Sequence, residues 1–230
     1  MKSPIILALD TKDLDLAGKW ISATSTYIDH FKIGLEFYLR HGRAGIEKLR
    51  KDAQFELFLD LKLYDIPNTV KGAVESVADL HPKFLTVHAS GGASMISAAK
   101  SALPNGSITA VTVLTSFSQS SFASMGYQSS IDETVSKWAA MAIKAGATSL
   151  VCSPYEVAAL RKVVGDAVLI TPGVRVEGDD HADQARVMTP QDALAAGSDF
   201  VVVGRSITNL WDGSAAGMCK KIEQIISSFK

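Results

Sequence analysis

Short apolar runs, rich in β-branched and aromatic residues, recur along the whole chain and are separated by stretches with helical periodicity. Apolar runs of this length predict strands that are buried on both faces, as in a parallel sheet. We predict strands over residues 5–9, 28–33, 55–61, 84–87, 108–114, 149–152, 167–170 and 200–203. The clearest helical stretches between them are residues 70–80, 94–103, 133–145 and 155–164.

The number of strand–helix units indicates the fold. Eight units within 230 residues favour an α/β fold of the TIM-barrel type, (β/α)8, over a doubly wound open sheet, which rarely needs more than about six strands. No Pro-rich, Ser-rich or charge-block linker divides the chain, so we expect a single barrel domain over residues 1–230. Two connections, 115–130 and 173–189, are long and polar, and such loops on barrels commonly act as lids.

Charge and composition limit the classes of partner. The formal net charge is −1, so there is no global basic field to attract nucleic acid or an anionic membrane, and a small ligand is favoured. The two cysteines, Cys152 and Cys219, lack metal-ligand and disulfide-framework spacing, which fits a reducing compartment. No apolar run approaches a signal-peptide core or the roughly 20 residues of a membrane span. We therefore expect a soluble cytoplasmic protein.

Charged residues gather at the predicted carboxyl ends of the first three strands, where barrel enzymes carry their active sites. Asp10 ends the first strand, Lys32 lies in the second, and Asp60 and Lys62 end the third, where strand alternation puts both on one face. A single Asp-x-Lys pair is more often a solvated ion pair worth under about 1 kcal/mol. Four charges of alternating sign at successive strand ends are better explained as a preorganised electrostatic site.

The segment after the last predicted strand has the composition of a phosphate site. Gly204 would let backbone amides approach an oxyanion, and Arg205 would clamp it. A Gly-Arg-Ser triplet alone is equally typical of an ordinary turn, but barrels often bind phosphate after strands seven and eight. His88 also ends a strand and is left without an assigned role, and the other histidines lack metal-ligand spacing.

One continuous motif carries a family resemblance. Residues 60–69, Asp-Leu-Lys-Leu-Tyr-Asp-Ile-Pro-Asn-Thr, closely resemble the signature Asp-x-Lys-x-x-Asp-Ile-Pro-Asn-Thr of orotidine 5′-monophosphate decarboxylases. Shorter matches join it: Leu-Asp at 9–10, Phe-Lys-Ile-Gly at 31–34, Leu-Thr-Ser at 114–116, Thr-Pro-Gly-Val-Arg at 171–175, Asp-Gln at 183–184 and Val-Gly-Arg-Ser at 203–206. The likeness spans residues 5 to about 210 and is nearest to the bacterial branch. Tyr64 departs from the histidine common in relatives and affects no assigned role.

The resemblance implies roles for these residues and a homodimer with shared active sites. Asp60, Lys62 and Asp65 of the partner subunit would form a charge array with Lys32, and Thr69 would reach the partner's ribose. The remaining implied substrate-binding residues are Asp10 and Lys32 at the ribose, Thr115 and Ser116 at the pyrimidine, Arg175, Gln184, Gly204 and Arg205 at the phosphate, and Pro172.

The chemistry of this reaction agrees with the implied placements. Loss of carbon dioxide from C6 of orotidylate leaves an sp² carbanion that the ring cannot easily delocalise, and no pyridoxal or thiamine motif supplies an electron sink. We therefore expect no cofactor. The Lys62 ammonium, kept protonated by flanking carboxylates, would oppose the developing charge and then protonate C6. Binding of the distant phosphate would drive closure of the 173–189 loop.

Two alternatives remain at this point. Metal-dependent relatives such as 3-keto-gulonate 6-phosphate decarboxylase and hexulose 6-phosphate synthase share Asp-x-Lys-x-x-Asp, but they put a metal-binding glutamate where this chain has Lys32. A cation there argues against a divalent metal, so we expect no metal. A non-catalytic phosphosugar- or nucleotide-binding barrel would keep Gly204 and Arg205 without needing Asp60, Lys62 and Asp65. The joint presence of all these residues favours the enzyme.

Overall fold

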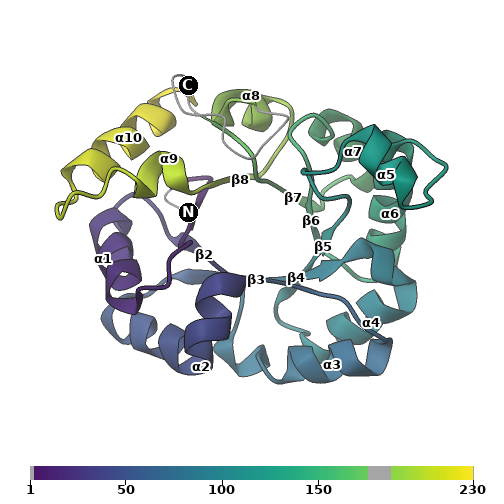
Figure 1. Cartoon of the computed structure of the whole chain (residues 1–230), viewed down its shortest axis with the longest axis horizontal. Coiled ribbons are helices and arrows are strands. Elements are labelled where there is room, and N and C mark those ends of the chain that lie inside the picture. Colours follow the sequence, from purple (N-terminus) through teal and green to yellow (C-terminus); the bar gives the residue numbers. More distant parts are fainter. Residues whose placement is uncertain (1–2, 176–187, 230) are drawn as a thin grey trace.

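The computed structural model describes residues 3–175 and 188–229. Eight parallel strands close into a barrel in chain order, with β1 hydrogen-bonded to both β2 and β8, and helices form a ring outside it (Figure 1). The strands are β1 Ile5–Ala8, β2 His30–Gly34, β3 Glu56–Leu63, β4 Phe84–His88, β5 Ser107–Val111, β6 Ser149–Val151, β7 Val168–Thr171 and β8 Phe200–Val203. The predicted (β/α)8 barrel is confirmed.

Helices follow the strands around the ring. They are α1 Leu14–Thr24, α2 Leu35–Asp52, α3 Pro67–Glu75, α4 Gly92–Ala102, α5 Gln119–Ser124, α6 Ile131–Lys144, α7 Val157–Val164, α8 Pro190–Ala195, α9 Arg205–Thr208 and α10 Ala216–Ser227, with 3₁₀ turns η1 Ala78–Leu80 and η2 Ala89–Gly91. The helix predicted at 70–80 is in fact two elements, α3 and η1. None of the helices in the described part of the chain is long and apolar enough to cross a membrane.

The fifth strand is shorter than its apolar run predicts. The run continues to residue 114, but β5 ends at Val111, and residues 112–114 are not part of the strand. Val113 remains buried against the core, so hydrophobicity alone cannot separate strand from buried loop. The polar connection 115–130 was predicted as a loop, yet it contains α5, whose first turn is closed by a capping box between Ser118 and Ser121.

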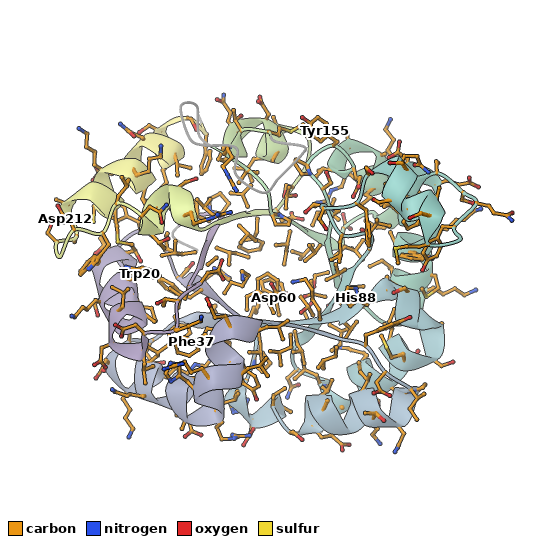
Figure 2. All side chains as sticks on the ribbon, in the orientation of Figure 1. Trp20, Phe37, Asp60, His88, Tyr155 and Asp212 are labelled. Atoms are coloured by element: carbon orange, nitrogen blue, oxygen red, sulfur yellow. The ribbon has the colours of Figure 1, made fainter. Side chains whose placement is uncertain are left out.

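The barrel interior is packed with large side chains below the mouth. Phe84 meets Phe58 and Phe200 edge-on, with ring centroids 5.8 and 5.7 Å apart. Figure 2 places Asp60 toward the centre of the ring, whereas Trp20 lies among the outer helices. Aromatic rings thus fill this part of the interior, and Asp60 and Lys62 lie further along β3, toward its carboxyl end.

Candidate active site

Four charged side chains from the first three strand ends form one continuous array. Lys32 Nζ lies 3.1 Å from Asp10 Oδ1 and 3.5 Å from Asp60 Oδ2. Lys62 Nζ lies 2.7 Å from Asp60 Oδ1. The signs therefore alternate from Asp10 through Lys32 and Asp60 to Lys62, and the structure brings together all four residues that the sequence placed at the strand ends.

The electrostatics of the array keep its two central members charged. Burial acts to lower the pKa of Lys32, but the charges of Asp60 and Asp10 outweigh it and raise that pKa above its ordinary value. Burial likewise acts to raise the pKa of Asp60, while Lys32 and Lys62 outweigh it and leave the pKa lowered. Only 13% of the Lys32 side chain and 12% of the Asp60 side chain are exposed, so water screens this pair weakly.

The backbone that carries Lys62 is not regular strand. The pairing of β3 with β4 shifts register between Leu59 and Leu63, and Lys62 has a left-handed φ of 49°. Its amide donates to Thr86 Oγ1 on β4 at 2.8 Å. The alternation rule correctly predicted that Lys62 and Asp60 would lie together, but the ideal strand geometry on which it relied ends before Lys62.

A small cavity of about 170 Å³ opens beside the array. Lys32, Asp60 and Lys62 supply its charged side, and apolar residues from β5, β6 and β8 face them across the barrel. The lining residues are Lys32, Phe58, Asp60, Lys62, Val111, Val113, Leu114, Thr115, Val151, Cys152, Pro172 and Val202. Burial raises the pKa of the Cys152 thiol, which is therefore neutral and part of the apolar wall.

The other predicted site residues differ in how close they lie to this cavity. Thr115 and Pro172 line it, whereas Ser116 is exposed beside Thr115. A Cβ on Gly204 would lie 3.7 Å from Asp10 Oδ2, so the turn after β8 runs close to the charge array. Arg205 begins α9 and is exposed at this end of the barrel.

The 173–189 connection can be described only at its ends. Val174 forms an isolated parallel bridge with Met188, and the Arg175 amide donates to the Met188 carbonyl at 3.0 Å. The Arg175 side chain is half-buried and donates to the Val174 carbonyl at 2.9 Å. Gln184, and with it the predicted lid, lies outside the described residues.

Asp65 and Thr69 stand apart from the array of their own chain. Both are exposed, and Asp65 Oδ1 accepts a hydrogen bond from the Ile66 amide at 2.7 Å. Within residues 3–175 and 188–229, no ion pair of 4.0 Å or less joins Asp65 to Lys62. The structure thus assembles Asp10, Lys32, Asp60 and Lys62 within one chain and leaves Asp65 outside.

His88, which the sequence left without a role, ends β4 near Lys62. Its ring packs edge-on against Tyr64, with centroids 5.7 Å apart. Burial lowers the pKa of His88, and the nearby Lys62 charge lowers it further against the opposing effect of Asp60. A neutral imidazole here adds no second positive charge beside Lys62.

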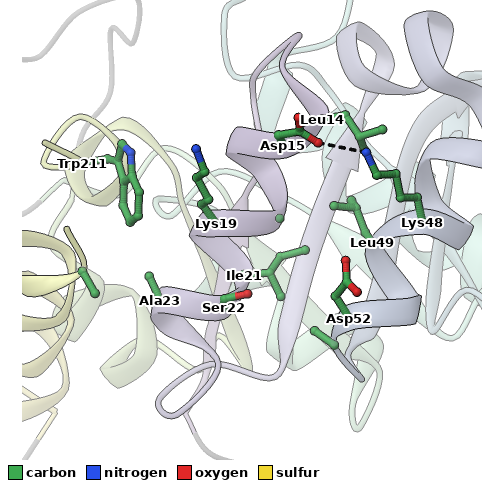
Figure 3. Close-up of a pocket in the computed structure, with 13 residues that line it drawn as sticks. Leu14, Asp15, Lys19, Ile21, Ser22, Ala23, Lys48, Leu49, Asp52 and Trp211 are labelled. Atoms are coloured by element: carbon green, nitrogen blue, oxygen red, sulfur yellow. Dashed lines mark hydrogen bonds and ion pairs between the residues drawn. The ribbon is translucent and has the colours of Figure 1, made fainter. Parts of the chain in front are cut away.

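A larger hollow of about 580 Å³ lies in the outer helical layer, between α1 and α2 and facing Trp211 (Figure 3). Two of its charged groups form an ion pair, Lys48 Nζ with Asp15 Oδ1 at 2.9 Å. No strand end contributes to its lining. The described residues also include no group of three or more His, Cys, Asp or Glu side chains placed to hold a metal ion. Size alone therefore does not mark the site, and the chemistry is concentrated at the barrel mouth.

Comparison with known proteins agrees with this geometry. The family model described as "Orotidine 5'-phosphate decarboxylase / HUMPS family" matches residues 3–217. The chain belongs to this family. An orotidine 5′-phosphate decarboxylase from Thermobifida fusca (strain YX) is 50% identical over 217 residues, covering 94% of this chain and 93% of the relative. One from Escherichia coli O45:K1 (strain S88 / ExPEC) is 40% identical, covering 91% and 88%. The crystal structure of orotidine 5′-phosphate decarboxylase from Lactobacillus acidophilus superposes with a TM-score of 0.83 at 33% identity, covering 99% of each chain.

The family name covers two groups, but these three relatives all carry the decarboxylase name. That agrees with the motif at residues 60–69.

Sequence reasoning missed two parts of this decarboxylase-family site. One is the apolar wall, of which Val151 and Val202 are examples, because these residues look like ordinary barrel core. The other is Thr86, a lone hydroxyl in an apolar strand that donates to Asp60 Oδ1 at 3.1 Å. In the sequence, the only indication of this role is that Thr86 is a polar residue two positions before His88, where the strand ends.

Proposed function

We propose that this chain decarboxylates orotidine 5′-monophosphate to uridine 5′-monophosphate, with the Lys62 ammonium as the proton donor to C6. The observation that carries the proposal is the contact of Lys62 Nζ with Asp60 Oδ1 at 2.7 Å, at the edge of a cavity whose opposite side is apolar. Family membership and the decarboxylase names of relatives 40–50% identical support the reaction.

The proposed reaction needs only one bond cleavage and one proton transfer. The bond between C6 and the carboxylate carbon breaks, carbon dioxide leaves, and the electron pair stays on C6. The Lys62 ammonium then transfers a proton to C6, and solvent later reprotonates the amine. A positive charge already fixed beside C6 needs little reorganisation as the carbanion forms, which is the main source of electrostatic catalysis.

Asp60 and Lys32 support the ammonium in this scheme. The lowered pKa of Asp60 keeps its carboxylate ionised, so the Lys62 ammonium lies 2.7 Å from an opposite charge that holds it in place. Lys32 neutralises the other side of Asp60, at 3.5 Å from Oδ2. The protein residues thus supply both the proton and the charge balance, and the scheme requires no metal or cofactor.

The rest of the nucleotide would extend from the cavity along the barrel mouth. We assign the ribose hydroxyls to Asp10 and Lys32, and the phosphate to Arg175, Gly204 and Arg205. Gly204 supports this assignment because its turn runs beside Asp10, and a backbone without a Cβ lets amides approach an oxyanion. The further assigned contacts are Thr115, Ser116 and Pro172, with Gln184 assigned from the family motif alone.

The complete site would require a homodimer in which Asp65 and Thr69 serve the neighbouring subunit. Two observations support it. The Asp65 carboxylate is occupied with the amide of Ile66 and does not pair with Lys62 within the described chain. Large apolar side chains around it are exposed, including Tyr64 at 62% and Ile66 at 67%. Clusters of exposed apolar residues commonly mark protein interfaces.

Turnover of orotidylate by the purified protein tests the proposal. Orotidylate should lose its ultraviolet absorbance, and chromatography should show uridine monophosphate as the product. Exhaustive chelation should leave the rate unchanged, because Lys32 occupies the place a metal ligand would need. If orotidylate is untouched, the proposal fails. Activity on a phosphosugar that appears only with added magnesium would then assign the metal-dependent chemistry, and no activity on either substrate would favour a non-catalytic barrel.

A further inference from the structure

Thr86 lies where the pairing of two barrel strands becomes irregular. Leu59 pairs with Leu85 and Leu63 with Val87, so four steps along β3 correspond to two steps along β4. The side chain of Thr86 is fully buried opposite this bulge. Bulges next to active sites commonly redirect a side chain, and here the bulged strand carries Asp60 and Lys62.

One hydroxyl group connects both of these residues. The Lys62 amide donates to Thr86 Oγ1 at 2.8 Å. A hydroxyl has a single proton, and the contact with Asp60 Oδ1 at 3.1 Å is where Thr86 donates it. The same Asp60 oxygen accepts from Lys62 Nζ at 2.7 Å. Thr86, Asp60 and Lys62 therefore close a ring of three hydrogen bonds.

We propose that Thr86 is a positioning residue for the decarboxylation: it fixes the Lys62 backbone and the Asp60 carboxylate relative to each other, so that the ammonium points at C6. The inference rests on the roles proposed above for Lys62 and Asp60. The left-handed φ of 49° at Lys62 is unfavourable for a residue with a Cβ, and such conformations persist where surrounding contacts impose them. The Thr86 hydroxyl is such a contact.

Burial makes the hydroxyl hard to replace. Thr86 is 0% exposed, so bulk water does not reach the position of its hydroxyl, and removing the hydroxyl leaves the Lys62 amide and Asp60 Oδ1 without the partner they have on that side. Misplacement of a catalytic group by about 1 Å can reduce the rate on the order of a hundredfold. Loss of the hydroxyl should therefore affect the chemical step more than nucleotide binding, which depends on groups elsewhere at the mouth.

The barrel supplies a matched control. Thr109 on β5 is the register partner of Thr86, is also 0% exposed, and its hydroxyl contacts Ser149 Oγ at 2.6 Å, away from the charge array. Thr86→Val and Thr109→Val each remove a buried hydroxyl from neighbouring strands with little change in shape. Thr86→Ser retains the hydroxyl, and Lys62→Ala in the same assay tests the premise.

The experiment measures kcat on orotidylate, the dissociation constant of uridine monophosphate and the thermal midpoint for each variant. Thr86→Val should lower kcat about tenfold to a hundredfold while product affinity changes less than about threefold. Thr86→Ser should have a kcat within about threefold of wild type. Thr109→Val should keep the wild-type kcat, even if its thermal midpoint falls as much as that of Thr86→Val.

The outcomes separate the inference from its premise. Wild-type kcat in Thr86→Val, or equal losses of kcat in Thr86→Val and Thr109→Val, would overturn the positioning role. Substantial turnover by Lys62→Ala would overturn the proposed proton donor itself. If Thr86→Val does not fold, Thr86→Cys decides, because a thiol is a weaker donor and acceptor: its kcat should fall well below that of Thr86→Ser, and equality would refute the inference.

Discussion

The ammonium nitrogen of Lys62 lies 2.7 Å from Oδ1 of Asp60, two residues earlier on the same strand. In a regular strand, alternate residues share a face but stand nearly 7 Å apart along it. The left-handed backbone of Lys62 accompanies the direct contact here. The ion pair that we propose as catalytic thus forms where β3 is irregular.

Lys62→Ala should abolish turnover of orotidylate while uridine monophosphate still binds. Proton delivery and carbanion stabilisation are lost, whereas the phosphate and ribose contacts remain. Lys137→Ala is the control, because Lys137 forms an exposed ion pair with Glu133 on α6, outside the mouth. Steady-state kinetics and product titration measure both properties. A Lys62→Ala rate within tenfold of wild type would remove Lys62 from the mechanism.

Arg205→Ala should lower kcat/KM for orotidylate but hardly change the reaction of the nucleoside that lacks phosphate. A lost charge-assisted clamp is worth about 2–3 kcal/mol, or roughly 30- to 160-fold in kcat/KM. The nucleoside is the internal control, because Arg205 would have no phosphate to hold. An equal loss of kcat/KM with both substrates would show that Arg205 does not act through the phosphate.

Mixing two inactive variants should restore activity if Asp65 serves the neighbouring subunit. Lys62→Ala and Asp65→Ala homodimers should each be nearly inactive. After random exchange, half of the dimers are mixed and half of their sites contain both native residues, so activity should recover to about a quarter of wild type.

Mass spectrometry provides the control for that mixing experiment, because it reports whether subunits have exchanged. Mixed dimers without any recovered activity would mean that Asp65 completes the site of its own chain. Recovery in proportion to the mixed dimers would support the shared site.

Leu39→Asp should weaken the proposed dimer. Leu39 on α2 is 79% exposed, and Leu35, one turn earlier on the same helix, is 47% exposed, so a charge there would face the apolar surface of a partner. We expect monomers in sedimentation at low micromolar concentration and activity that rises with protein concentration. Val163→Asp, at a 46% exposed position on α7 in another part of the helical ring (Figure 1), should leave sedimentation unchanged. Identical sedimentation of both variants would place the interface elsewhere.

The amino-acid sequence alone is enough to predict the barrel and the charges at its mouth. Alternation of buried strands with amphipathic helices is a local pattern, and eight repeats of it leave few arrangements other than a closed barrel. A barrel brings the carboxyl ends of all strands to one rim, so Asp10, Lys32, Asp60 and Lys62 could be assigned to one site before any distance was known. The motif at residues 60–69 added the reaction.

The contacts that hold those groups become clear only in the folded chain. The end of β5 at Val111, the short helix α5 and the apolar wall of the cavity depend on contacts between strands, which periodicity does not encode. The register shift between β3 and β4 is of the same kind. Thr86 is 24 residues from Lys62 in the chain, and its hydroxyl gains a role because the bulge brings the Lys62 amide and the Asp60 carboxylate within its reach. Hydrogen-bond partners across strands are set by register, and register follows from how the whole barrel closes.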